Sequence, residues 1–86
     1  MEEMYQNELD KLRLEIQMID SDILRLLEER VSTAKVIGQI KKCYNMPVYV
    51  PEVEKKKIET LSSRCQYPGL VEAIWPVIMC YTRTVE

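Results

Sequence analysis

The stretch that decides the fold covers residues 9–44 and reads LDKLRLEIQMIDSDILRLLEERVSTAKVIGQIKKCY. Its apolar residues recur at alternating spacings of three and four, which places them on one face of an α-helix. The members of this apolar series are Leu9, Leu12, Ile16, Ile19, Ile23 and Leu26, and the series resumes at Ile37, Ile40 and Tyr44. We therefore expect one very long helix from about Asn7, a suitable N-terminal cap, to about Cys43.

Two shorter helices are predicted after this long one. Pro51 suits the first position of a helix, and the glutamates that follow it suit the positive end of the helix dipole. The pair Pro68-Gly69 is typical of a turn and closes a predicted break over residues 62–69. A third helix is expected from about Leu70, and Pro76 inside it should bend the helix because proline lacks a backbone N–H group.

The length of the first helix predicts how the chain assembles. At a rise of 1.5 Å per residue, this helix would be about 55 Å long. A compact chain of 86 residues has a radius of gyration of only about 12 Å, so the helix would extend beyond its own globule. Its apolar face needs a partner, and a second copy of the chain is the simplest one. We expect an all-α fold of three helices in a single domain over residues 1–86, assembled as an intertwined homodimer.

Composition excludes several classes of protein. Hydrophobic residues make up 47% and charged residues 30% of the chain, as in a globular protein. No apolar run is long enough to span a membrane, and the N-terminus lacks the basic start and apolar stretch of a signal peptide. A net charge of -2 gives no general attraction to nucleic acid. We expect a cytoplasmic protein that binds neither nucleic acid nor membranes.

The reactive side chains also limit the chemistry. Histidine is absent, which removes the most common general base and most catalytic zinc sites. The three cysteines, Cys43, Cys65 and Cys80, are odd in number and widely spaced, which favours free thiols in a reducing compartment. We expect no metal and no cofactor, and chemistry that uses carboxylates, amines, guanidinium groups and hydroxyls.

Three cations lie on or beside the apolar face of the long helix. Arg30 takes the position after Leu26 in the apolar series, and Lys41, eleven residues further, points nearly the same way. These two residues are about 16 Å apart along the helix, whereas Arg13 is about 25 Å from Arg30. An antiparallel second copy could place its Arg13 near Arg30 and Lys41 of the first.

Two carboxylates interrupt the apolar faces of the other helices. They are Glu54 and Glu86, and Thr82 stands one turn before Glu86. Charges that point inward are normally paired or hold a ligand, because an unpaired buried charge is costly. One interpretation is a set of structural ion pairs, such as Arg30 with Glu54, or side chains whose tips reach water. The other is a pocket for a small dianion that carries a hydroxyl or an ether oxygen.

The ordered set of these residues resembles the all-helical chorismate mutases. The matching segments cover nearly the whole chain from about Leu9. They are Leu12-Arg13, Ile19-Asp20, the run from Leu26 to Arg30, the run from Ile37 to Lys41, the run from Pro47 to Glu54, and the run from Ile74 to Met79 that continues to Thr82 and Glu86. The chain departs from the family at Val50 and Val53, where the family commonly has aspartate and arginine.

The resemblance implies three helices per chain, two entwined chains, and two sites that each take one arginine from the partner. Arg13 of the partner subunit and Arg30 would hold the two substrate carboxylates. Lys41 would bind near the ether oxygen and a carboxylate, Glu54 would accept the substrate hydroxyl, and Thr82 and Glu86 would lie near the ring and the ether oxygen. Lys41, Glu86 and Arg30 are the expected catalytic residues.

The implied reaction is the rearrangement of chorismate to prephenate in aromatic amino-acid biosynthesis, without a cofactor or a covalent intermediate. An activating partner enzyme that orders the end of the third helix is a further expectation. Two alternatives stay open from the sequence. One is an isochorismate pyruvate lyase on the same fold, and the other is a non-catalytic helical dimerisation module.

Overall fold

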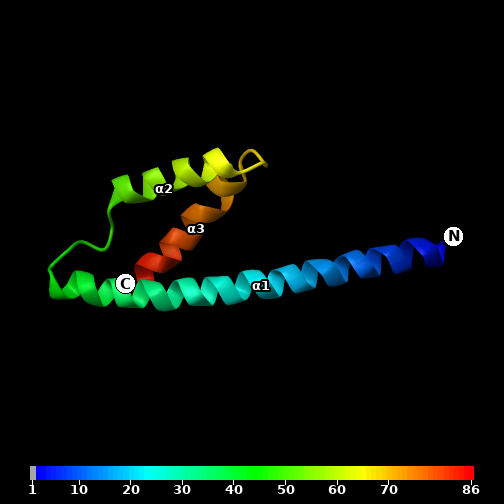
Figure 1. Cartoon of the computed structure of the whole chain (residues 1–86), viewed down its shortest axis with the longest axis horizontal. Helices are drawn as coiled ribbons and strands as arrows, with labels where there is room; N and C mark the ends of the chain where they lie inside the picture. Colours follow the sequence, from blue (N-terminus) through cyan, green and yellow to red (C-terminus); the bar gives the residue numbers. More distant parts are fainter. Residues whose placement is uncertain (1) are drawn as a thin grey trace. The chain divides into compact units, whose positions relative to one another are not determined.

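The computed structural model describes residues 2–86, with side chains from Met4 onward. Three helices follow one another along the chain: α1 (Glu2–Cys43), α2 (Pro51–Arg64) and α3 (Leu70–Val85) (Figure 1). Over residues 2–86 no strand is present. The expected all-α fold with a long first helix is therefore confirmed.

The start of α1 differs from the prediction. The helix already includes Glu2, so Asn7 lies inside it and does not cap it. The residues before Asn7 include glutamate, methionine and glutamine, which are strong helix formers. Asparagine is only mildly unfavourable within a helix, so the N-terminal residues extend α1 past the expected cap.

Turn residues fix the ends of the helices. At the end of α1, the Met46 N–H donates to the Lys41 carbonyl at 2.8 Å, and Asn45 adopts a left-handed φ of 59°. This is the arrangement of a Schellman cap, which turns the chain sharply away from the helix. Pro51 occupies the start of α2 as predicted, and Gly69, with a φ of 84°, precedes α3. A residue with a Cβ atom at this glycine would be strained.

Two smaller features complete the comparison with the prediction. The second helix continues to Arg64, so the break between α2 and α3 is shorter than expected. Pro76 lies inside α3, which the structure assigns as one helix from Leu70 to Val85. In the part of the chain that the structure describes, no helix combines the length and apolarity that crossing a membrane requires.

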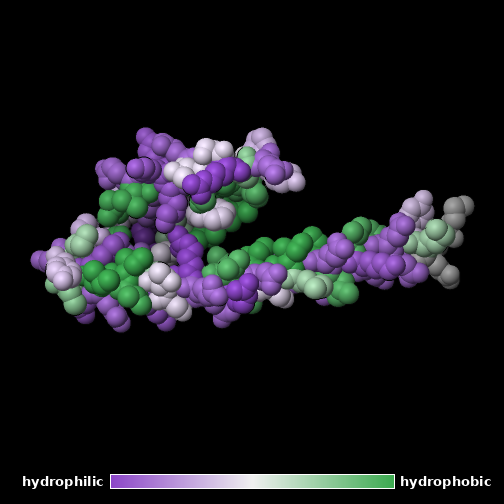
Figure 2. Space-filling view, viewed as in Figure 1, coloured by the Kyte–Doolittle hydropathy of each residue, from purple (hydrophilic) through white to green (hydrophobic). Residues whose placement is uncertain are grey.

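The chain divides into two compact units, one ending at Arg30 and one comprising Val31–Glu86. The first unit is the N-terminal part of α1, and its apolar series is exposed. Leu12, Ile16 and Ile19 are 56%, 57% and 53% exposed. Figure 2 shows the hydrophobic side chains as a band along this part of the helix. An apolar surface of this extent is typical of an interface.

The second unit contains the small core of the chain. Its α2 and α3 pack against each other, and the buried apolar residues are Ala34, Val71 and Met79. No residue of α2 is buried, and Val77 of α3 is 69% exposed. The second unit therefore also leaves apolar surface open on its helices.

Gly38 allows a close approach within the second unit. A Cβ atom at this position would lie 2.6 Å from the carbonyl oxygen of Glu86 and 2.7 Å from its Cα atom. Any larger residue would have to move the Glu86 backbone. The glycine thus lets the end of α3 reach the C-terminal part of α1 (Figure 1).

Candidate active site

Lys41 and Glu86 form an ion pair that is largely shielded from solvent. The Lys41 Nζ atom lies 2.6 Å from Glu86 Oε1, and the two side chains are 17% and 9% exposed. Lys41 Nζ also donates to the carbonyl oxygen of Val48 at 3.0 Å. These acceptors use two of the three ammonium N–H bonds, and the third can serve a ligand. Two predicted catalytic residues are therefore in direct contact.

The local sequence explains how this pair forms. Lys41 lies in the last turn of α1, where a cation is favoured by the negative end of the helix dipole. The cap at Asn45 turns the following loop back, so that the Val48 carbonyl reaches the Lys41 ammonium. Glu86 directly follows α3, and its backbone lies against Gly38. Three separate segments thus fix one ammonium group.

Glu54 forms a second ion pair, with Arg83 of α3. The Arg83 Nη1 atom donates to both carboxylate oxygens of Glu54 at 2.6 Å. The guanidinium carbon also lies 4.6 Å from the centre of the Tyr49 ring, a cation–π contact. The hydrogen bond to Glu54 raises the pKa of Arg83 above its usual value. Glu54 is therefore held as one member of a three-residue cluster.

The sequence interpretation did not select Arg83 as a site residue. It considered the helical face that carries Thr82 and Glu86 and did not follow the face next to it. The signal was present, because Arg83 follows the buried Met79 by four residues and therefore lies on the same side of α3. An arginine on the buried side of a helix needs an acidic partner, and Glu54 is that partner.

Thr82 occupies the same last turn of α3. Its hydroxyl donates to the carbonyl oxygen of Ile78 at 2.8 Å, and its side chain is half-buried. This bond to the preceding turn is common for threonine in helices. Thr82 and Arg83 in the last turn of α3 and Glu86 directly after it thus place a hydroxyl, a cation and a carboxylate at the end of this helix.

The other two predicted site residues lie in the first unit. Arg13 Nη1 is 3.7 Å from Asp10 Oδ1, and both side chains are about two-thirds exposed. An ion pair this exposed stabilises a protein very little, so Arg13 can exchange its partner at low cost. Arg30 is half-buried and ends the first unit. The residues brought together in the second unit are therefore Lys41 with Glu86, and Glu54 with Arg83.

A groove with a volume of about 530 Å³ lies between α2 and α3. This volume falls within the usual range of about 300–1,000 Å³ for small-molecule sites. Glu54 and Arg83 are part of its lining, so the groove gives access to this ion pair. The full lining is Tyr49, Pro51, Glu54, Lys55, Ile58, Glu59, Pro76, Met79 and Arg83.

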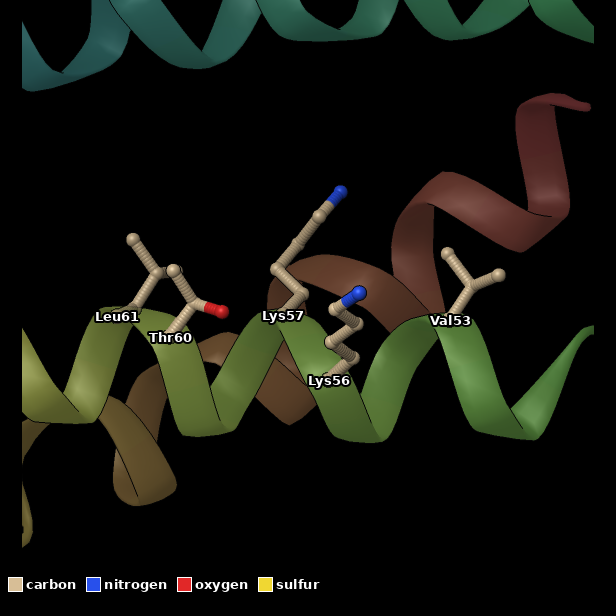
Figure 3. Close-up of a pocket in the computed structure, with 5 residues that line it drawn as sticks. All are labelled: Val53, Lys56, Lys57, Thr60 and Leu61. Carbon is tan, nitrogen blue, oxygen red and sulfur yellow. The ribbon is translucent and has the colours of Figure 1, made fainter.

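A second, shallower hollow lies along α2 alone (Figure 3). Its lining side chains follow the spacing of a single helix face and point to the same side: Val53, Lys56, Lys57, Thr60 and Leu61. Two ammonium groups stand there beside apolar side chains, without an acidic residue in the lining. This hollow is the surface of an amphipathic helix, and it does not gather groups for chemistry. Among the described residues, no cluster of acidic, cysteine or histidine residues suits a metal ion.

The fold and the site define a class of protein. The described residues form three helices, and the C-terminal end of α3 meets a lysine of α1 and a glutamate of α2. Cations and carboxylates in such alternation suit a small anionic ligand that also carries hydroxyl or ether oxygens.

Comparison with known proteins identifies the family. The sequence model of the chorismate mutase type II family matches residues 12–86, and the chain belongs to this family. The resemblance inferred from the motifs is therefore confirmed. No solved structure matches the chain.

Three relatives show how the chain compares with longer proteins. A bifunctional chorismate mutase/prephenate dehydratase from Aquifex aeolicus is 52% identical over 54 residues, which cover 63% of this chain and 15% of the relative. A T-protein from Enterobacter agglomerans is 30% identical over 83 residues, 92% of this chain and 22% of the relative. A chorismate mutase from Methanocaldococcus jannaschii is 35% identical over 66 residues, 77% of this chain and 67% of the relative. The chain thus spans less than a quarter of the length of the first two relatives.

Proposed function

We propose that this chain is a chorismate mutase, an isomerase that rearranges chorismate to prephenate in aromatic amino-acid biosynthesis. The observation that carries the proposal is the Lys41–Glu86 pair, formed by two predicted catalytic residues in a chain that belongs to this family. The proposal treats residues 1–86 as one mutase domain of a cytoplasmic protein that needs no cofactor.

The reaction needs positioning more than acid–base chemistry. One carbon–oxygen bond of the ether breaks and one carbon–carbon bond forms within the same molecule, and no proton has to move. Catalysis then consists of holding the reactive conformer and stabilising the negative charge that develops on the ether oxygen. The absence of histidine is no obstacle to such a mechanism.

Lys41 is the residue that faces the ether oxygen in this proposal. Its ammonium is fixed by Glu86 and by the Val48 carbonyl, so the remaining N–H bond has a defined direction before substrate binds. A donor held in place in advance costs no reorganisation when the charge develops. Glu86 acts by holding Lys41.

The remaining groups bind the ends of the substrate. Arg30 and Arg13 of the partner subunit hold the two carboxylates, because arginine can bind a carboxylate through two parallel hydrogen bonds. Glu54 accepts the hydrogen bond of the ring hydroxyl. Thr82, one turn before Glu86, lies beside the ring. These assignments follow the family resemblance, and the contact that restrains the Glu54 carboxylate supports the assignment of Glu54.

The proposal includes an intertwined homodimer. Its support is the exposed apolar series of α1, in which Leu12 and Ile16 are each more than half exposed, together with the small core of the second unit. A second copy of the same helix would cover such a series and bring Arg13 to the neighbouring site. A partner enzyme that activates the domain is also part of the proposal, because Val50 and Val53 stand where the family commonly has aspartate and arginine.

The test is the disappearance of chorismate, followed by absorbance, with product identification. We expect prephenate as the product of the wild-type protein, and loss of turnover in Arg30→Ala. Arg64→Ala is the matched control, because Arg64 is an exposed arginine of α2 away from the site. A folded wild-type dimer that consumes isochorismate and not chorismate would support the lyase alternative. A dimer that consumes neither, even beside a partner enzyme, would contradict the proposed function.

A further inference from the structure

Glu54 is the acceptor for the substrate hydroxyl in the proposed function, and its direction therefore matters. A glutamate side chain has three rotatable bonds, so a free carboxylate would sample many directions. The structure shows this carboxylate restrained from outside its own helix. Its two oxygens accept hydrogen bonds from one nitrogen of Arg83, and its side chain is 23% exposed.

Arg83 is itself restrained on a second side. Its guanidinium carbon lies 4.6 Å from the centre of the Tyr49 ring, which belongs to the loop before α2. The Tyr49 ring and the Glu54 carboxylate thus contact the same guanidinium group. The loop, α2 and α3 each contribute one member of the cluster. The restraint on Glu54 therefore depends on the packing of α3 against α2 and the loop before it.

The position of Arg83 connects the two ion pairs of the site. Arg83 and Glu86 are three residues apart at the end of α3, so they lie within one helical turn. Glu86 fixes Lys41, the donor for the ether oxygen, and Arg83 fixes Glu54, the acceptor for the hydroxyl. In chorismate the hydroxyl and the ether oxygen are on adjacent ring carbons, so donor and acceptor have to keep a fixed separation.

We propose that Arg83 is a positioning residue, which holds the Glu54 carboxylate in the direction that accepts the substrate hydroxyl. This inference rests on the proposed function. A positioning role for Arg83 differs from a purely structural ion pair between α2 and α3 in one respect. A structural pair would affect every substrate equally, whereas a positioning residue acts only through the hydroxyl that Glu54 binds.

The experiment compares two substrates with matched variants. One substrate is chorismate, and the other is the analogue that lacks the ring hydroxyl. Arg83→Met removes the charge and keeps most of the side-chain volume, and Arg83→Lys keeps the charge without the forked donors. Arg64→Ala again serves as the control on an exposed arginine. Circular dichroism establishes the melting temperature of each variant, and the rates are measured well below it.

We expect Arg83→Met to lower kcat/KM for chorismate about 10- to 100-fold, the usual effect of a misplaced binding group. With the hydroxyl-free analogue, the rate should stay at the wild-type level. The kcat/KM of Arg83→Lys for chorismate should lie between the values of the wild type and Arg83→Met. The double variant Glu54→Gln/Arg83→Met should lose little more kcat/KM for chorismate than Glu54→Gln alone, because the two residues act through one interaction.

Two outcomes would overturn the inference while leaving the proposed function intact. One is an equal loss of rate on both substrates, which is the mark of a structural pair. The other is full chorismate activity in both Arg83 variants. A wild-type protein without any activity on chorismate contradicts the proposed function itself, so the two failures are distinguishable.

Discussion

Lys41 Nζ and Glu86 Oε1 are 2.6 Å apart, although the two residues are separated by 45 positions in the sequence. The contact depends on Gly38, one turn before Lys41 on α1, because only a residue without a Cβ atom leaves room for the Glu86 backbone. A single glycine thus links the packing of the second unit to the geometry of the proposed site.

Substitution of Gly38 tests this link. In an ordinary helix interior, Gly→Ala stabilises by about 1 kcal/mol. Here the added Cβ atom would meet backbone atoms of Glu86 at 2.6–2.7 Å, and overpacking of this kind costs about 1–3 kcal/mol. We expect Gly38→Ala to lower the melting temperature and to reduce chorismate turnover. Ser32→Ala, at an exposed position of the same helix, should change neither. A Gly38→Ala protein that is more stable and fully active would contradict this account.

Removal of the Lys41 ammonium should distinguish its contribution to kcat from its contribution to the stability of the fold. Lys41→Met deletes the donor that we propose for the ether oxygen, and the loss of one such donor costs about 100- to 1,000-fold in kcat. It also leaves Glu86, only 9% exposed, without its cation, so stability should fall by about 1–3 kcal/mol. Steady-state kinetics and urea unfolding measure the two effects. If Lys41→Met kept its wild-type kcat, Lys41 would be a structural residue only.

A hydrogen bond between α2 and α3 predicts a pH effect on stability. The Ser62 hydroxyl donates to Glu72, and this bond lowers the pKa of Glu72 below its usual value of 4.5. Because the folded pKa lies below the unfolded one, the bond stabilises the fold above about pH 4.5. The contribution is lost as the pH falls through the folded pKa. Ser62→Ala should therefore be less stable than the wild type at pH 7, and the difference should shrink towards pH 3.

Urea unfolding at the two pH values checks this prediction. Ser63→Ala is the control, because the Ser63 hydroxyl donates to the Thr60 carbonyl, which does not titrate. Any effect of that variant should be the same at both pH values. If Ser62→Ala lost as much stability relative to the wild type at pH 3 as at pH 7, the Glu72 carboxylate would not be involved.

The helices could be predicted because their signals are local. The spacing of apolar residues indicated the long α1, and Pro51 and Gly69 marked the helix starts that the structure confirms. The start of α1 was misplaced, since Asn7 is a good cap whose effect was outweighed by the helix formers before it. Such competition between neighbouring preferences shifts a helix end by several residues.

The pairing of charges could be predicted only in part. Glu54, Lys41 and Glu86 stood out because they interrupt apolar faces. Arg83 did not stand out as the partner of Glu54. Pairing between α2 and α3 depends on how the two helices cross, and the sequence alone does not show this crossing. The spacing from Met79 placed Arg83 on one side of the third helix, but its pairing with Glu54 became recognisable only once the Arg83 Nη1 atom was located beside both Glu54 oxygens. The role of Gly38 was hidden for the same reason, since its neighbour Glu86 is distant in the sequence.

We propose that each subunit contributes Arg13 to the site of its partner subunit. This arrangement predicts that two inactive variants can complement each other. Each site would combine Lys41 of one chain with Arg13 of the partner subunit. Arg13→Ala and Lys41→Met homodimers should therefore both be nearly inactive. When the two proteins are mixed, unfolded in urea and refolded together, half of the dimers are mixed, and each mixed dimer holds one intact site. Chorismate turnover should then return to about a quarter of the wild-type value, as expected for random pairing of two chains.

The control for this experiment is Arg13→Ala refolded with the double variant Arg13→Ala/Lys41→Met. No combination of these chains restores an intact site, so turnover should stay at the background level. The exposed apolar series around Ile16 and Ile19 is the surface through which the subunits would associate. If the first mixture also stayed inactive while native mass spectrometry showed mixed dimers, Arg13 would act within its own chain or outside the site. A protein that remained monomeric at all concentrations would exclude the shared site altogether.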